Sequence, residues 1–151
     1  MNINNAQGDT IEILLRQMGA SDVTKIRGLL YFMTFKLSDD VEISYSYNIN
    51  TQDKYFLQRI KPYPIPQGVF SDEYEIVSFI KKDLQKFRTA INSSNFNLFI
   101  DVAKKVNNIT YMAEYLFLNY NVNVNELLRI NKELDDILKE IEIAKTTSKE
   151  I

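Results

Sequence analysis

Several residue types on which common enzymes and metal sites depend are missing from this chain. Its 151 residues include no cysteine, no histidine and no tryptophan. Without cysteine and histidine the chain lacks cysteine nucleophiles, serine–histidine pairs, thiol redox chemistry and the usual zinc ligands. Acid–base catalysis would therefore fall on aspartate, glutamate, lysine or tyrosine. We expect no metal and no other cofactor.

Glycine and proline are also scarce. The spacing of the four glycines matches neither a phosphate-binding loop nor a dinucleotide fingerprint. All three prolines lie within residues 62–66. Because proline cannot donate a hydrogen bond to a sheet, we expect the preceding strand to be an edge strand and residues 62–68 to be a stiff connector. The alternative is an exposed polyproline-type ligand segment.

Long apolar runs and an excess of positive charge are absent too. No apolar run approaches membrane-spanning length, and residues 1–8 lack the basic and apolar regions of a signal peptide. The net charge is −2, which counts against binding to duplex phosphates. We therefore expect a cytoplasmic protein with no membrane contact. The abundant asparagine, isoleucine and lysine favour an AT-rich source, such as a low-GC bacterium or its phage.

Residues 25–66 have the pattern of a three-stranded antiparallel meander. From Val41 to Ile49 apolar and polar residues alternate, which is the period of a strand with one buried face. A three-residue turn at 38–40 would place Phe35 opposite Ile43. A slip by one residue would bury a glutamate, so this pattern specifies the first register strongly.

The same parity argument predicts the register of the second hairpin. A four-residue turn at 50–53 would pair Tyr47 with Phe56 on the inner face, which is the face predicted to be buried. The outer face, on the other side of the sheet, would then carry rows that cross all three strands. These rows are Leu30–Asn48–Tyr55, Phe32–Ser46–Leu57, Thr34–Ser44–Arg59 and Lys36–Glu42–Lys61.

Helical spacing of apolar residues predicts one helix before the meander and three after it. We expect the first helix over 9–18, a helical part over 71–145 and a frayed tail over 146–151. Capping signals occur at Ser71, at 93–95 and at Asn123. The predicted fold is a single α+β domain over 1–151, with an N-terminal helix, a three-stranded antiparallel β-meander and three C-terminal helices packed as a helical layer or small bundle.

Two features of the helical part leave alternatives open. The Asn107–Asn108 pair lies in the middle of the third helix and would break or kink it, because asparagine is a poor helix former. The last helix, over 124–145, has apolar residues at heptad spacing. Packing within a bundle explains this stripe, and so does a homodimer through this helix.

The outer face of the meander is the candidate partner-binding surface. One end is polar with a basic excess and the other is apolar, and apolar patches with polar rims are typical of interfaces. A covering helix or second subunit would explain the same pattern without a partner. The candidate residues are Leu30, Phe32, Lys36, Tyr55, Leu57, Arg59 and Lys61.

Three function hypotheses follow from these residues. The first is a non-enzymatic protein-interaction module, meaning a regulator, adaptor or inhibitor that docks on another macromolecule. The second is single-stranded nucleic-acid binding, in which sheet aromatics stack bases beside lysine and arginine. The third is an enzyme that uses carboxylate or tyrosine chemistry. The adjacent carboxylates at 39–40, 72–73 and 135–136 are more typical of a turn, a helix cap and a solvated helix face.

Overall fold

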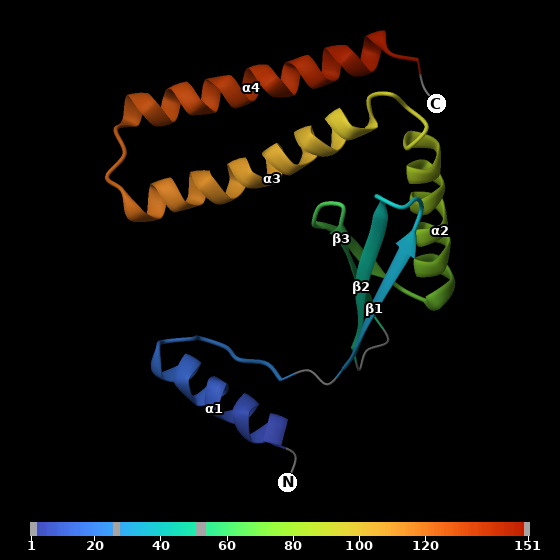
Figure 1. Ribbon diagram of the computed structural model, residues 1–151. Helices are drawn as coiled ribbons and strands as arrows, with labels where there is room; N and C mark the ends of the chain where they lie inside the picture. Colours follow the sequence, from blue (N-terminus) through green and yellow to red (C-terminus); the bar gives the residue numbers. More distant parts are fainter. Residues whose placement is uncertain (1–2, 26–27, 51–53, 150–151) are drawn as a thin grey trace. The chain divides into compact units, whose positions relative to one another are not determined.

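The computed structural model describes residues 3–25, 28–50 and 54–149. The α+β class is confirmed, with one N-terminal helix, an antiparallel sheet and three C-terminal helices, but the sheet has four strands where three were predicted. The elements in order are α1 (Ile3–Gln17), β1 (Gly28–Lys36), β2 (Glu42–Asn50), β3 (Tyr55–Lys61), β4 (Ile65–Phe70), α2 (Glu73–Ala90), α3 (Phe96–Asn119) and α4 (Val124–Thr147) (Figure 1).

The chain divides into two compact units, Met1–Ile100 and Asp101–Ile151, with the boundary inside α3. The first unit contains the whole sheet and α2. The second contains most of α3 together with α4. Two compact units can belong to one domain, so the single domain over 1–151 stays a prediction.

The first hairpin is confirmed residue by residue. Phe35 pairs with Ile43, Met33 with Tyr45, and Lys36 with Glu42. The loop closes where Leu37 N–H donates to the Val41 carbonyl at 2.9 Å. Strict alternation in β2 was therefore sufficient to predict this register.

The predicted register of the second hairpin is wrong by one residue. Leu57 pairs with Tyr47, Arg59 pairs with Tyr45, and Phe56 pairs with Asn48. Residues 51–53 of the predicted turn lie outside the described residues. In the strand β3 both the odd-numbered and the even-numbered positions carry apolar residues. Its sequence alone therefore does not show which side chains point to the core. The face is decided by packing, because Leu57 is fully buried in the core.

The proline-containing segment is a fourth strand, which corrects the predicted connector at 62–68. Residues Ile65–Phe70 pair antiparallel with β3, so β4 is the edge that β3 was expected to be. Pro66 is accommodated because one side of an edge strand has no ladder partner. The pairing is irregular next to Leu57 and Gln58, and Gly68 has φ +119°. Only a residue without Cβ adopts such a backbone readily.

The helix ends largely follow the capping signals, with three corrections. The N-cap of α2 is Asp72 and not Ser71, because the Asp72 carboxylate accepts the N–H groups of Tyr74 and Glu75, both at 2.8 Å. The helix α1 starts at Ile3, before the predicted Asp9. The Asn123 cap of α4 is confirmed, and α4 continues to Thr147, two residues past the predicted end.

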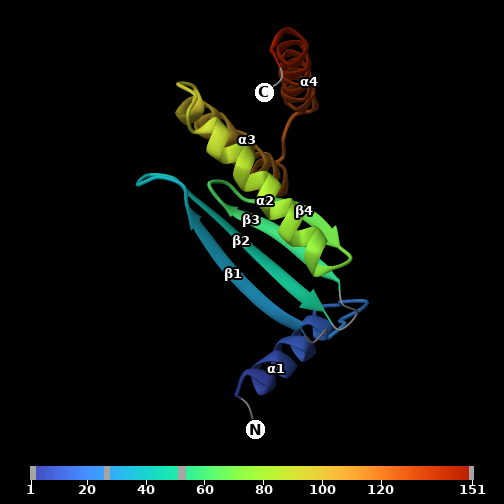
Figure 2. The ribbon, with the colours of Figure 1, turned by 90° about the vertical axis from the view of Figure 1, so that its right-hand side faces the viewer.

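The hydrophobic core lies between α2 and one face of the sheet. The helix α2 packs on β3 and β4 (Figure 2), and Met33 and Phe35 of β1 pack against the same core. Helix α3 runs through the Asn107–Asn108 pair without a break. The core contains Ile43, Tyr45 and Leu57 of the sheet, Ile76, Ile80, Leu84 and Phe87 of α2, and Phe96 at the start of α3. Within the described part of the chain, no helix is long and apolar enough to cross a membrane.

Candidate partner-binding surface

The outer face of the sheet, which points away from α2, carries exposed apolar side chains. The Tyr45 hydroxyl reaches Asp83 of α2, so the residues of β2 on either side of Tyr45 belong to the outer face. Leu30, Asn48, Phe56 and Val69 form one row across all four strands. Phe32 lies on the same face two residues after Leu30. We call Leu30, Phe32, Phe56 and Val69 the outer patch, and their exposed fractions are 60%, 71%, 46% and 64%.

The strand β1 is the most exposed part of this surface. Its four successive residues Leu29, Leu30, Tyr31 and Phe32 are all exposed. Leu29 and Tyr31 belong to the inner face but are 61% and 42% exposed, and the Tyr31 ring stacks on Tyr47 at 4.8 Å between centroids. The side of β1 away from β2 pairs with no other strand among the described residues. It is therefore a long apolar edge strand.

The two edges of the sheet differ in how they are protected against another strand. In β4, Pro66, the left-handed Gly68 and a pairing irregularity interrupt the regular edge. These are devices with which proteins block edge-to-edge pairing. The strand β1 pairs with β2 without a register shift and contains no proline, and its only charged residue is Lys36 at its end. An edge of this kind is suited to accept another strand.

A charged cluster on the inner face joins α2 to the sheet. The guanidinium of Arg59 binds both carboxylate oxygens of Asp83 through Nη1, at 3.1 and 2.9 Å. The Tyr45 hydroxyl donates to the same carboxylate at 2.7 Å. Burial and the neighbouring Asp83 raise the pKa of Tyr45 above its ordinary value, so the hydroxyl stays neutral and remains a donor.

The Arg59 side chain lies wholly within this interior site. Its guanidinium carbon lies 4.7 Å from the centroid of the Tyr63 ring and 4.9 Å from that of Phe87. Both distances are within the range of cation–π contacts. Arg59 is only 5% exposed, and among the described residues its Nε finds no acceptor. This arginine holds the α2 layer on the sheet.

The structure separates the seven predicted surface residues into two groups. Leu30, Phe32 and Lys36 lie on the outer face of β1, as predicted. Lys61 also lies on the outer face, because the irregularity at Ser44 and Tyr45 places it opposite Ser44. Its Nζ pairs with Glu42 at 3.1 Å. The other three, Tyr55, Leu57 and Arg59, belong to the inner face.

Sequence reasoning missed Phe56 and Val69, the other two members of the outer patch. The one-residue error in β3 moved Phe56 to the predicted core. Val69 was missed because the proline-rich segment was not recognised as a strand. The β-branched and aromatic residues Ile65, Val69 and Phe70 beside the prolines were a weak signal for that strand.

The described residues contain no group of three or more aspartates and glutamates close enough to hold a metal ion. Of the three adjacent carboxylate pairs, Asp72 caps α2 and Asp136 lies 3.4 Å from Lys139 on the exposed face of α4. Both placements match the structural roles expected from the sequence.

Comparison with known proteins adds no assignment to this surface. No family model matches the chain, and searches of curated proteins and of solved structures returned no match.

Proposed function

We propose that the chain is a protein-interaction module that binds an extended segment of another protein along β1. The observation that carries this proposal is the run of four exposed apolar residues, Leu29 to Phe32, on an unprotected sheet edge. A regulator, adaptor or inhibitor that acts by docking fits such a surface.

Strand addition uses two parts of the edge. Backbone N–H and C=O groups on the open side of β1 would supply main-chain hydrogen bonds to the added strand. The exposed side chains of Leu30 and Phe32 would select the apolar residues of the partner, because alternate residues of an added strand lie on the same face. Phe56 and Val69 extend the apolar contact across the outer face.

Single-stranded nucleic acid is the second candidate, favoured by the exposed Phe32 and Phe56 on one sheet face. Bases could stack on these two rings. The charges fit less well, because Arg59 is buried against Asp83 and Lys61 is paired with Glu42. Lys36 is then the one predicted surface cation with no ion pair among the described residues, so we favour a protein partner.

Self-association through the last helix, predicted over 124–145, is a separate proposal. It is supported by the exposure of Ile137 and Ile141 on the heptad stripe of α4.

The docking proposal is tested with two matched double variants of the full chain. L30K/F32K places charges on the β1 edge, and Y74K/V77K makes the same kind of change at two exposed positions of α2. Proteins captured by the wild-type chain are identified by mass spectrometry, and the purified partner is titrated calorimetrically. We expect L30K/F32K to weaken binding by about 10- to 100-fold, because two apolar contacts are lost. Y74K/V77K should bind like the wild type.

Two results would contradict this assignment. If both double variants bind the purified partner with wild-type affinity, β1 is not the docking strand. If the wild type instead binds a single-stranded oligonucleotide with an affinity that falls steeply with salt, and L30K/F32K does not, the nucleic-acid alternative is correct.

A further inference from the structure

The helices α3 and α4 form an antiparallel hairpin joined by residues 120–123 (Figure 1). None of the described side chains from Asp101 onwards is buried. Each helix has 24 residues, so each is about 36 Å long at 1.5 Å per residue. Helices of this length with apolar stripes gain most of their stability from packing those stripes. The hairpin by itself leaves the stripes exposed.

The heptad stripe of α4 is covered only at its start. Leu127, Ile130 and Leu134 are half-buried, whereas Ile137 and Ile141 further along the same stripe are 43% and 54% exposed. Apolar residues at heptad spacing share one face of a helix. The heptad face of α4 is therefore packed against a neighbour near the turn at 120–123, and among the described residues it has no neighbour towards the C-terminal end of the helix.

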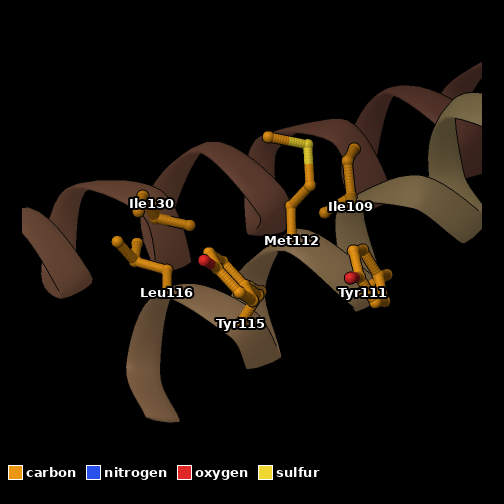
Figure 3. A pocket seen from close by; sticks show the side chains of 7 residues that line it. Ile109, Tyr111, Met112, Tyr115, Leu116 and Ile130 are labelled. Atoms are coloured by element: carbon orange, nitrogen blue, oxygen red, sulfur yellow. The ribbon is translucent and has the colours of Figure 1, made fainter. Parts of the chain in front are cut away.

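A cavity of about 380 Å³ opens on the hairpin near the middle of α3. Figure 3 shows Ile109, Met112 and Leu116 in a row along α3, with Ile130 contributed by α4. Ala113, Tyr111 and Tyr115 complete the lining, and the two tyrosine rings are stacked at 6.4 Å between centroids. The lining is almost wholly apolar, so an apolar side chain is the group that would fill it.

The second half of α3 is apolar on more than one side. Ile109, Met112 and Leu116 recur at three- and four-residue spacing and form one face, while Tyr111, Tyr115 and Leu118 form a second. A helix that is apolar on several sides belongs in the interior of a bundle. The single neighbour α4 covers one of these faces at most.

We propose that the α3–α4 hairpins of two copies of this chain pack together into a four-helix arrangement, with the second half of α3 and its cavity at the centre of the interface. In a two-fold dimer the same patch is used by both copies. Each copy would insert apolar side chains of its α3 surface into the cavity of the other. Four helices provide each apolar face with a neighbour, which two helices cannot do.

The charge distribution favours a second copy as the occupant. Between Val106 and Asn125 the only charged residue is Glu114. A patch with so little charge can face itself without like-charge repulsion, which a self-complementary interface requires. Residues 101–151 carry seven lysines and arginines against nine aspartates and glutamates, a net charge of −2. That sign disfavours an anionic membrane surface or a nucleic acid as the occupant.

The exposed area is also sufficient for a stable dimer. Fifteen large apolar side chains of the described residues from Asp101 onwards are exposed. At roughly half exposure each, they present on the order of 1,000 Å² of apolar surface per copy, compared with about 800 Å² per partner in a standard interface. The exposed residues are Val102, Val106, Ile109, Tyr111, Met112, Tyr115, Phe117, Leu118, Tyr120, Val124, Leu128, Ile137, Leu138, Ile141 and Ile143.

The mass of the full chain in solution tests the dimer. Light scattering and sedimentation equilibrium are measured from low to high micromolar concentration for the wild type, for M112K/Y115K and for the matched control Y74K/V77K. We expect the wild type and the control to have twice the mass of the chain. The expected mass of M112K/Y115K is that of a monomer, with helical circular dichroism retained. A wild-type monomer at every concentration, or a dimer that M112K/Y115K leaves intact, would refute the proposal.

A cross-linking measurement gives an answer even if M112K/Y115K fails to fold. The chain has no cysteine, so a single introduced thiol can pair only with its counterpart in a second copy. Single cysteines placed in turn at positions 111, 112, 115 and 118 should include at least one that oxidises to a covalent dimer, while Tyr74→Cys on α2 stays monomeric. If no α3 cysteine cross-links faster than Tyr74→Cys, or if the wild type instead binds anionic phospholipid vesicles through this surface, the dimer proposal is wrong.

Discussion

Arg59 shows how a single residue can change the interpretation of a surface. In the sequence it is one of several cations beside aromatic residues, which is a pattern of nucleic-acid-binding sheets. In the structure it lies between two aromatic rings and binds Asp83 of α2. Its charge is neutralised inside the protein and contributes nothing to the outer face.

The Arg59–Asp83 pair leads to a stability prediction. Asp83→Ala would leave the guanidinium buried without its carboxylate, and removal of one partner from a buried pair typically costs about 3–5 kcal/mol. We expect a loss of about 3 kcal/mol or more in the free energy of unfolding, measured by urea denaturation.

Asp136→Ala is the matched control for this prediction. It removes a carboxylate from an exposed ion pair with Lys139. Exposed pairs contribute at most about 1 kcal/mol, so this variant should unfold nearly as the wild type does. Equal effects of the two substitutions would show that Asp83 does not compensate a buried charge.

At the scale of elements, the two edge strands of the sheet differ in whether they can pair with a further strand. The strand β4 carries proline and an irregular pairing, which block further strands, and β1 carries neither. This contrast carries the docking proposal. Pairing with the alternating residues 41–49 predicted the strand β1, but its position at an open edge follows from the order of strands in the sheet.

The start of α2 provides a prediction at the same scale. Asp72 caps the helix by accepting two backbone N–H groups, and Ser71 lies one residue before it. Asp72→Ala should lower the free energy of unfolding by about 1 kcal/mol, and Ser71→Ala by less than about 0.5 kcal/mol. The denaturant midpoints of the two variants decide which residue is the cap. A larger loss of stability in Ser71→Ala than in Asp72→Ala would show that Ser71 is the N-cap.

At the scale of the whole molecule, all buried side chains of the described residues lie in the first unit. The core runs from Ile43 to Phe96, and the part-buried Ile100 packs against it.

Truncation after Lys104 tests whether the first unit folds without the second. The fragment keeps every core residue, so we expect cooperative thermal unfolding and dispersed amide resonances. It lacks the second half of α3, so we also expect a monomer at concentrations where the full chain is a dimer. An unfolded fragment would mean that the second unit is required for the core, and a dimeric fragment would place the interface outside the hairpin.

The sequence by itself determined the first hairpin and the presence of the helices, which depend on local periodicity. Strict alternation from Val41 to Ile49, closed by a polar turn at 38–40, was enough for the first hairpin. Helical spacing and the Asn123 cap were enough for the C-terminal helices. In the first hairpin one face is apolar and the other polar, so a shifted register would expose apolar residues or bury charge.

Only the tertiary structure decided which side chains of β3 point to the core and whether β4 forms. Both faces of β3 carry apolar residues, so either register satisfies its own pattern. The choice depends on Asp83, which lies 24 residues after Arg59 in the chain and reaches it only when α2 packs on the sheet. The strand β4 forms despite Pro66 because an edge strand needs hydrogen bonds on one side only.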